Sequence, residues 1–302
     1  TVEVSVEASE PLAEELTSFC RAARGEAPPP VAGSEGLEAL RVAERVLGAI
    51  REHAPALPEA PAIHHALGLS LVRAGKQEEA MAEKGVELLE KGEVKALMKG
   101  HIHTDEFLHP ILLHHLQGKK RISHVFLADL KTYPKLLYIT DAAINISPDL
   151  FTKMHIVQNA VDIARLLGVA EPKVAALSAV EVVNPAIPST IDAACLAKMA
   201  DRGQIVGAIV DGPLAFDNAI STESAKVKGV HSSVSGDVDI LMVPELVSGN
   251  ILSKDLEYLA GAQLAGFVVG TKVPIILTSR SDPPRARLIS CAVAALVSHR
   301  ME

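Results

Sequence analysis

The clearest candidate for chemistry in this 302-residue sequence is the segment Ser279-Arg280-Ser281-Asp282-Pro-Pro. A strand is predicted to end just before it, and Asp-Pro-Pro is typical of the start of a helix. An arginine beside a helix N-terminus offers a guanidinium fork and free backbone N–H groups, which together suit a phosphate. The alternative is a helix cap made by Ser281 or Asp282, with Arg280 in solvent. The segment therefore predicts an anion site or a cap.

Polar residues follow most of the other predicted strands too. Six post-strand segments are rich in acidic, amide, hydroxyl or Gly residues: 100–106, 141–149, 180–185, 211–217, 244–250 and 279–282. Ligands of open α/β sheets bind outside the carboxyl ends of strands, so the series predicts the floor of a cleft. Asp141 and Asn145 form either part of this polar floor or a turn that caps the helix expected near Asp149.

The sequence contains twelve histidines, and His101 and His103 follow a predicted strand. Some metal-dependent hydrolases place two imidazoles in this way, but they need further His and Asp ligands from later strands. His155, His231 and His299 are not at predicted strand ends. We therefore predict no metal site and keep a hydrolase using His101 and His103 as an alternative.

Periodicity indicates a chain of alternating strands and helices from about residue 60. Short apolar runs predict buried strands at 94–99, 124–128, 136–140, 173–179, 205–210, 238–243, 266–270 and 273–278. Helical patterns cover 63–91, 148–167, 188–202, 214–226, 248–265 and 283–298. This alternation predicts an α/β fold with mainly parallel sheets flanked by helices.

Composition excludes several classes of protein. The net charge of −8 and the aromatic content of 3%, without Trp, argue against nucleic-acid binding. No apolar run is long enough to span a membrane, and residues 1–11 lack the features of a signal peptide. Three scattered cysteines without a CxxC motif indicate neither a disulfide scaffold nor a thiolate zinc site. We expect a cytoplasmic protein.

The first 60 residues differ from the rest. They contain eleven Glu and five Arg but neither Lys nor Asp. Residues 11–26 and 36–50 resemble the C-terminal end of the glucose-fructose oxidoreductase / inositol dehydrogenase family. The chain has no GxGxxG motif, so this resemblance brings none of that family's chemistry. We interpret residues 1–60 as an atypical N-terminal appendage.

The remainder, about 60–302, resembles the phosphate acetyltransferase / phosphate butyryltransferase family, nearer the butyryl branch. The match is carried by ALMKGHIHTDE, DAAINISPD, LSAVEVVNP, STIDAACLAKMADRG, DGPLAFDNAIS, DVDILMVPELVSGNILSK and AGFVVGTKVPIILTSRSD, in consistent order. It implies that acyl-CoA and phosphate are converted reversibly to acyl phosphate and CoA, without a bound cofactor. It also implies a two-domain fold like that of isocitrate dehydrogenase, an interdomain cleft and a homodimer. We expect residues 61–145 with 279–302 in the first domain and 146–278 in the second.

The resemblance also implies roles for individual residues. Ser279 and Arg280 match the family's Ser-Arg pair and would bind phosphate. The other implied cleft residues are the catalytic candidate Asp211 and the substrate-binding candidates Asn250, Gly212, Arg121, His103, Asp141 and Asn145. Lys99 and Lys254 could attract the CoA phosphates or be solvated charges.

Three departures from the family pattern affect this prediction. His109 stands where the acetyl branch carries an arginine. The acetyl branch's carboxylate beyond Ser-Arg, proposed to take the thiol proton, has no counterpart, and Asp282 is the nearest acid. The N-terminal appendage replaces the usual opening unit, so a non-catalytic CoA-binding relic is a further alternative.

Overall fold

The computed structural model describes residues 78–301 except 93, 101, 115, 117, 119, 280, 281 and 283. The N-terminal appendage, the first part of the helix predicted over 63–91, His101 and Arg280 therefore lie outside the described residues. None of the helices in the described part is both long and apolar enough to cross a bilayer.

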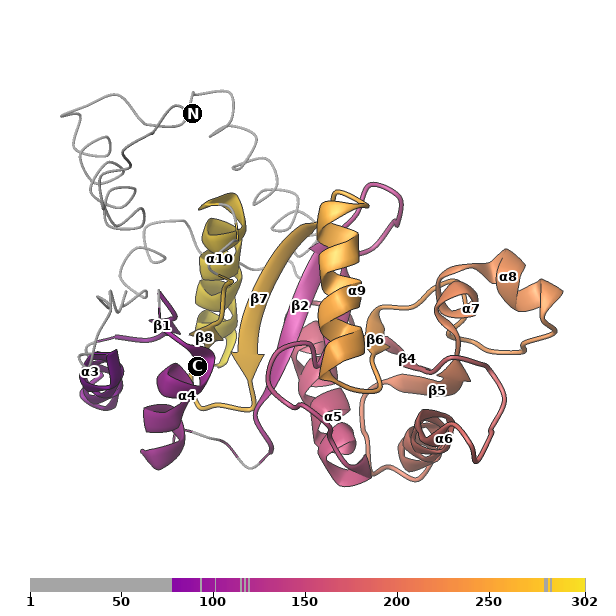
Figure 1. Cartoon of the computed structure of the whole chain (residues 1–302), viewed down its shortest axis with the longest axis horizontal. Helices are drawn as coiled ribbons and strands as arrows, with labels where there is room; N and C mark the ends of the chain where they lie inside the picture. The colour runs from indigo at the N-terminus through magenta and orange to yellow at the C-terminus, as the bar shows by residue number, and fades with distance from the viewer. Residues whose placement is uncertain are drawn as a thin grey trace, which may run out of the picture.

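Eight strands form one sheet in the order β1-β8-β7-β2-β3-β6-β4-β5 (Figure 1). They are β1 (Leu97–Met98), β2 (Ser123–Asp129), β3 (Leu137–Thr140), β4 (Lys173–Leu177), β5 (Ile209–Leu214), β6 (Ile240–Met242), β7 (Gln263–Val269) and β8 (Ile275–Ile276). Four neighbouring pairs are parallel, and the three pairs β8–β7, β7–β2 and β2–β3 are antiparallel. The predicted α/β class with a mainly parallel sheet and flanking helices is confirmed.

The antiparallel pairs change where the strands end. β3, β6, β4 and β5 run opposite to β1 and β8, so their carboxyl ends point to the other edge of the sheet. The carboxyl ends of the strands therefore do not all lie at one edge of the sheet, and the cleft floor expected from the six polar segments stays a prediction. An apolar run looks the same in either strand direction, and only the pairing reveals this difference.

Helices cover both faces of the sheet. α5 (Leu150–Leu166), α6 (Pro188–Asp201) and α10 (Pro284–Met301) share one apolar core with residues of β2, β4 and β7. On the opposite face, α9 (Leu246–Tyr258) and α7 (Phe216–Ile220) pack into a second core, and α8 (Thr222–Val227) follows α7. α3 (Glu78–Glu90) and α4 (Thr104–Leu113) pack with β1 at one end of the molecule (Figure 1).

The structure shifts, shortens or divides three of the predicted elements, and others differ by a few residues at their ends. The strand predicted over 205–210 is shifted to Ile209–Leu214. The helix predicted over 248–265 ends at Tyr258, because Gly261 adopts a φ of 68° and the chain turns there into β7. The helix predicted over 214–226 is two helices, separated at Ser221, whose hydroxyl accepts the N–H of Ser224 and caps α8.

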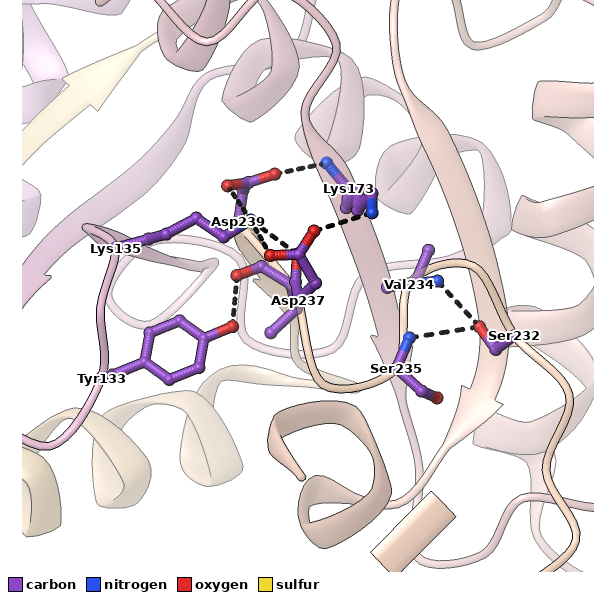
Figure 2. Close-up of polar contacts among 9 residues, drawn as sticks. Tyr133, Lys135, Lys173, Ser232, Val234, Ser235, Asp237 and Asp239 are labelled. Atoms are coloured by element: carbon purple, nitrogen blue, oxygen red, sulfur yellow. Dashed lines mark hydrogen bonds and ion pairs between the residues drawn. The ribbon is translucent and has the colours of Figure 1, made fainter. Parts of the chain in front are cut away.

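An ion-pair network joins the amino ends of β3, β4 and β6 (Figure 2). The nearly buried Asp239 carboxylate accepts the Lys135 ammonium at 2.9 Å and the Lys173 backbone N–H at 2.8 Å. Asp237 pairs with the same two lysines, at 2.8 and 2.7 Å. Burial raises the pKa of the adjacent Tyr133, whose hydroxyl donates to the carbonyl between the two aspartates, to about 12. The network fixes the register of three strands.

Candidate active site

The loop after β3 folds around a buried carboxylate. Asp141 is 2% exposed and directly follows β3. Its carboxylate accepts the backbone N–H groups of Ala143, Ile144 and Asn145 at 3.0 to 3.2 Å. The cap of α5 is instead Asp149, whose carboxylate accepts an N–H of the first helical turn at 2.7 Å. Asp141 therefore organises its own loop and does not cap α5.

Asn145 ties this loop to the start of β2. Its side-chain amide donates to the Asp141 carboxylate and, at 2.9 Å, to the carbonyl of Ile122. The neighbouring Arg121 is exposed, and its main chain is held from both directions by two side chains of α5, at 3.1 and 2.7 Å. The main-chain position of Arg121 is thus fixed beside the loop after β3.

The N-terminus of α9 packs against the same loop. The Glu245 carboxylate caps this helix by accepting two N–H groups at 2.7 and 2.8 Å. At Gly249, a Cβ atom would stand only 2.9 Å from the carbonyl oxygen of Asp141, so a side chain would not fit there. Next to it, the Asn250 amide donates to the Ala142 carbonyl at 3.4 Å. The helix and the loop therefore form one unit.

Ser279 and Asp282 are hydrogen-bonded to each other, and Asp282 contacts α9. The Ser279 N–H donates to Asp282 Oδ2 at 2.7 Å, and the Asp282 N–H donates to the Ser279 carbonyl at 3.2 Å. The second carboxylate oxygen, Oδ1, lies 3.5 Å from Lys254 Nζ on α9, and this ammonium also contacts Glu257 Oε2 at 2.8 Å. Asp282 thus binds Ser279 and Lys254, and these contacts leave the two predicted alternatives, an anion site or a helix cap, as predictions.

A buried histidine lies near both acidic residues. His124 is fully buried near the start of β2, and its ring meets Phe126 edge-to-face with centroids 4.4 Å apart. A Cβ at Gly266 would come within 3.0 Å of its Nε2. Burial lowers the pKa of His124 to about 4, although the carboxylates of Asp141 and Asp282 favour the charged ring. His124 is therefore neutral at pH 7.

His103 borders this region. It precedes α4, is exposed and makes no capping hydrogen bond from its side chain. The adjacent Ile102 shares an apolar cluster with Ala143 and Ile144 of the loop after β3. Contacts among the described residues therefore bring seven predicted site residues into one region: Asp141, Asn145, Arg121, Asn250, Ser279, Asp282 and His103.

Asp211 and Gly212 lie elsewhere. They were expected at a strand end but fall inside β5, which is the edge strand and lies three strands from β3. At about 4.8 Å per strand this separation is about 14 Å. A Cβ at Gly212 would stand 2.7 Å from the carbonyl oxygen of Ala176, so close packing explains this glycine. Their predicted roles at the cleft stay predictions.

Sequence reasoning missed His124 in this region. It stands at the start of an apolar strand, and a polar residue beside a buried run is a usable signal of an unusual environment. Lys254, expected either near the CoA phosphates or in solvent, lies four residues after Asn250, a spacing that places both on one side of a helix. No group of three or more His, Cys, Asp or Glu residues suited to a metal ion occurs within the described ranges.

Comparisons with known proteins identify the family. Residues 63–295 match the family described as "Phosphate acetyl/butaryl transferase". The chain belongs to this family. It is 54% identical over 223 residues to a phosphate acetyltransferase of Rhizobium meliloti, covering 73% of this chain and 71% of that protein. It is 56% identical to a phosphate acetyltransferase of Rickettsia felis, covering 72% and 63%, so the chain spans less than two thirds of that protein's length.

The butyryl branch and a solved structure are similar as well. A phosphate butyryltransferase of Clostridium acetobutylicum is 45% identical over 219 residues, covering 72% of this chain and 73% of that protein. The crystal structure of a branched-chain phosphotransacylase from Enterococcus faecalis V583 superposes with a TM-score of 0.70 and 32% identity, covering 84% and 94%. The prediction of a phosphate acetyl/butyryltransferase-type acyltransferase is confirmed, and the hydrolase alternative finds no support.

Proposed function

We propose that this chain catalyses the reversible transfer of a short acyl group between CoA and inorganic phosphate where the loop after β3 and α9 meet the segment of Ser279 and Asp282. The supporting observation is the contact between three segments that are distant in the sequence. Asp141 meets α9 at Gly249, and α9 meets Asp282 through Lys254. All three segments carry the family resemblance.

The proposed reaction needs no covalent acyl-enzyme. A phosphate oxygen bonds to the thioester carbonyl carbon, the C–S bond breaks, and the proton that phosphate gives up passes to the CoA sulfur. Ser279 and Arg280 would bind the phosphate, since a hydroxyl and a guanidinium fork match its oxygens. Asn250 would add a polar contact from α9. Fixed donors around a developing oxyanion are the main source of rate acceleration in acyl transfer.

The proposal also covers the oligomeric state, the location, the substrates, the domain bounds and the residues of the cleft. We propose a homodimer in the cytoplasm that uses the CoA thioester and phosphate as substrates, without a resident cofactor. The first domain would comprise 61–145 with 279–302, and the second 146–278. Asp211 and Gly212 would line the cleft from the second domain, and Arg121, His103, Asp141 and Asn145 from the first.

The direct test is thiol release from acetyl-, butyryl- and isobutyryl-CoA, each with and without added phosphate. Release that depends on phosphate supports the proposal, and the ranking of the three substrates gives the acyl preference. Release without phosphate would indicate a thioesterase instead. No release from folded protein would favour the CoA-binding relic, which a CoA-induced rise in melting temperature would detect.

Two variants test the placement of phosphate. Arg280→Ala should raise the KM for phosphate and lower turnover by about 10²- to 10³-fold, the scale for loss of a transition-state contact. Ser279→Ala should lower turnover in the same direction. The matched controls are Arg202→Ala and Ser233→Ala, which change exposed residues. If Arg280→Ala behaves like Arg202→Ala, phosphate binds elsewhere.

A further inference from the structure

Lys254 connects α9 to Asp282, which is hydrogen-bonded to the predicted phosphate-binding residue Ser279. Its ammonium lies 2.8 Å from Glu257 Oε2 and 3.5 Å from Asp282 Oδ1, and 5.5 Å above the Tyr258 ring. Burial disfavours the charged form, yet Glu257 and Asp282 together raise the pKa of Lys254. The ammonium is thus held by Glu257 of its own helix and by Asp282, which follows β8.

The carboxylate that Lys254 contacts is already engaged. Asp282 is 11% exposed in its side chain, and its Oδ2 accepts the Ser279 N–H at 2.7 Å. The other oxygen, Oδ1, faces Lys254. Both oxygens of this carboxylate therefore face donors within the protein. This geometry suits an anchor better than a proton acceptor.

These contacts form a continuous series of polar interactions, which we call the strut. It runs from Glu257 to Lys254 on α9, then to the Asp282 carboxylate, and ends at the backbone N–H of Ser279. The N-terminal turn of the same helix contacts the loop after β3 at Gly249 and Asn250. α9 therefore holds both halves of the candidate site in a fixed relation.

We propose that Lys254 is a positioning residue that acts through Asp282 to hold Ser279 for phosphate binding, and that Asp282 serves as an anchor for Ser279 rather than as the base for the CoA thiol. This inference rests on the proposed acyl transfer for its kinetic consequences only. The strut itself predicts a local structural effect that does not require activity.

The kinetic test compares Lys254→Met with wild type in phosphate-dependent thiol release. We expect the KM for phosphate to rise and kcat to fall, each by roughly 10-fold or more, because small misplacements of binding groups cost up to about 100-fold. The KM for acyl-CoA should change much less. Lys254→Arg should restore most of the loss. Lys198→Met removes an exposed lysine paired with Asp201 and is the matched control.

A double-mutant comparison tests the route through Asp282. If Lys254 acts through that carboxylate, Lys254→Met and Asp282→Asn should be strongly non-additive in phosphate KM. A rise confined to the KM for acyl-CoA would overturn the inference and make Lys254 a direct ligand of the CoA phosphates. Unchanged kinetics in Lys254→Met would overturn it as well.

Hydrogen exchange at the Ser279 amide supplies the readout that is independent of activity. Lys254→Met should speed exchange at this amide by about tenfold or more, whereas Lys198→Met should leave it unchanged. Melting temperatures of all variants show whether each is folded. If the wild type released no thiol, the proposed function would fail. The exchange rate at the Ser279 amide would still show whether Lys254 holds Ser279 through Asp282. Unaltered exchange at Ser279 in folded Lys254→Met would refute the strut.

Discussion

Acid should destabilise this protein through a single buried imidazole. His124 is fully buried, and burial lowers its pKa from 6.5 to about 4. The groups that face it are the Asp141 and Asp282 carboxylates, the Leu277 backbone, the Phe126 ring and β7 at Gly266. The unfolded chain binds a proton near pH 6.5, and the folded protein does so only near pH 4.

The magnitude follows from these two values. A folded-state pKa that is lowered gives a contribution that is complete above pH 6.5 and is lost as the pH falls toward 4. A difference of about 2.5 pKa units corresponds to about 3 kcal/mol in total. About 2 kcal/mol of this is lost between pH 7 and pH 5. For a protein of this size the melting temperature should fall by about 4–8 °C over the same range.

Urea unfolding at a series of pH values measures this effect. His124→Gln cannot take up the proton, so its stability should fall by about 2 kcal/mol less than wild type between pH 7 and pH 5. His231→Gln, which changes an exposed histidine, is the control. Should the glutamine variant not fold, the wild-type slope still reports the uptake of one proton on unfolding. A pH dependence identical in wild type and His124→Gln would refute the reasoning.

Three further substitutions have defined outcomes. Gly212→Ala should lower the free energy of unfolding by about 1–3 kcal/mol in urea titrations, because its Cβ would stand 2.7 Å from the Ala176 carbonyl oxygen. Gly249→Ala should displace α9 from the Asp141 carbonyl and reduce phosphate-dependent thiol release about tenfold. Asp239→Asn should cost about 2–4 kcal/mol of unfolding free energy, because it removes a buried charge that is paired with lysine.

A control variant and the opposite result for each substitution test these three predictions. Asp201→Asn removes an exposed aspartate paired with Lys198, and it should change the unfolding free energy by less than about 1 kcal/mol. A similar loss in Asp201→Asn and Asp239→Asn would contradict the importance of burial. Wild-type stability in Gly212→Ala, or wild-type turnover in Gly249→Ala, would show that the neighbouring backbone adjusts freely.

The sequence predicted the strands better than their directions. The apolar run at 136–140 corresponds closely to β3, which is buried along its whole length. The same kind of run gave β2 and β7, yet nothing in their residues shows that they pair antiparallel. Direction depends on contacts with strands that are distant in the sequence, and a local pattern does not contain them.

The candidate site was predictable to a similar extent. Asp141 was expected as a polar residue after a strand, and the structure places it there, although its role as the centre of a turn needs the loop conformation. Asp211 was misplaced because β5 continues through a Gly-Pro step that an edge strand tolerates. Lys254 reaches Asp282 only through the packing of α9, which no spacing rule supplies.

The order of strands also has a consequence for synthesis of the chain on the ribosome. β7 and β8 come late in the sequence but lie between β1 and β2 in the sheet. During translation β1 must wait for nearly all of the described chain before its partner β8 emerges, whereas β2 and β3 can pair at once. Growing chains should therefore expose an unpaired edge of β2 from its emergence until β7 is made, and chaperones or other nascent chains can bind there.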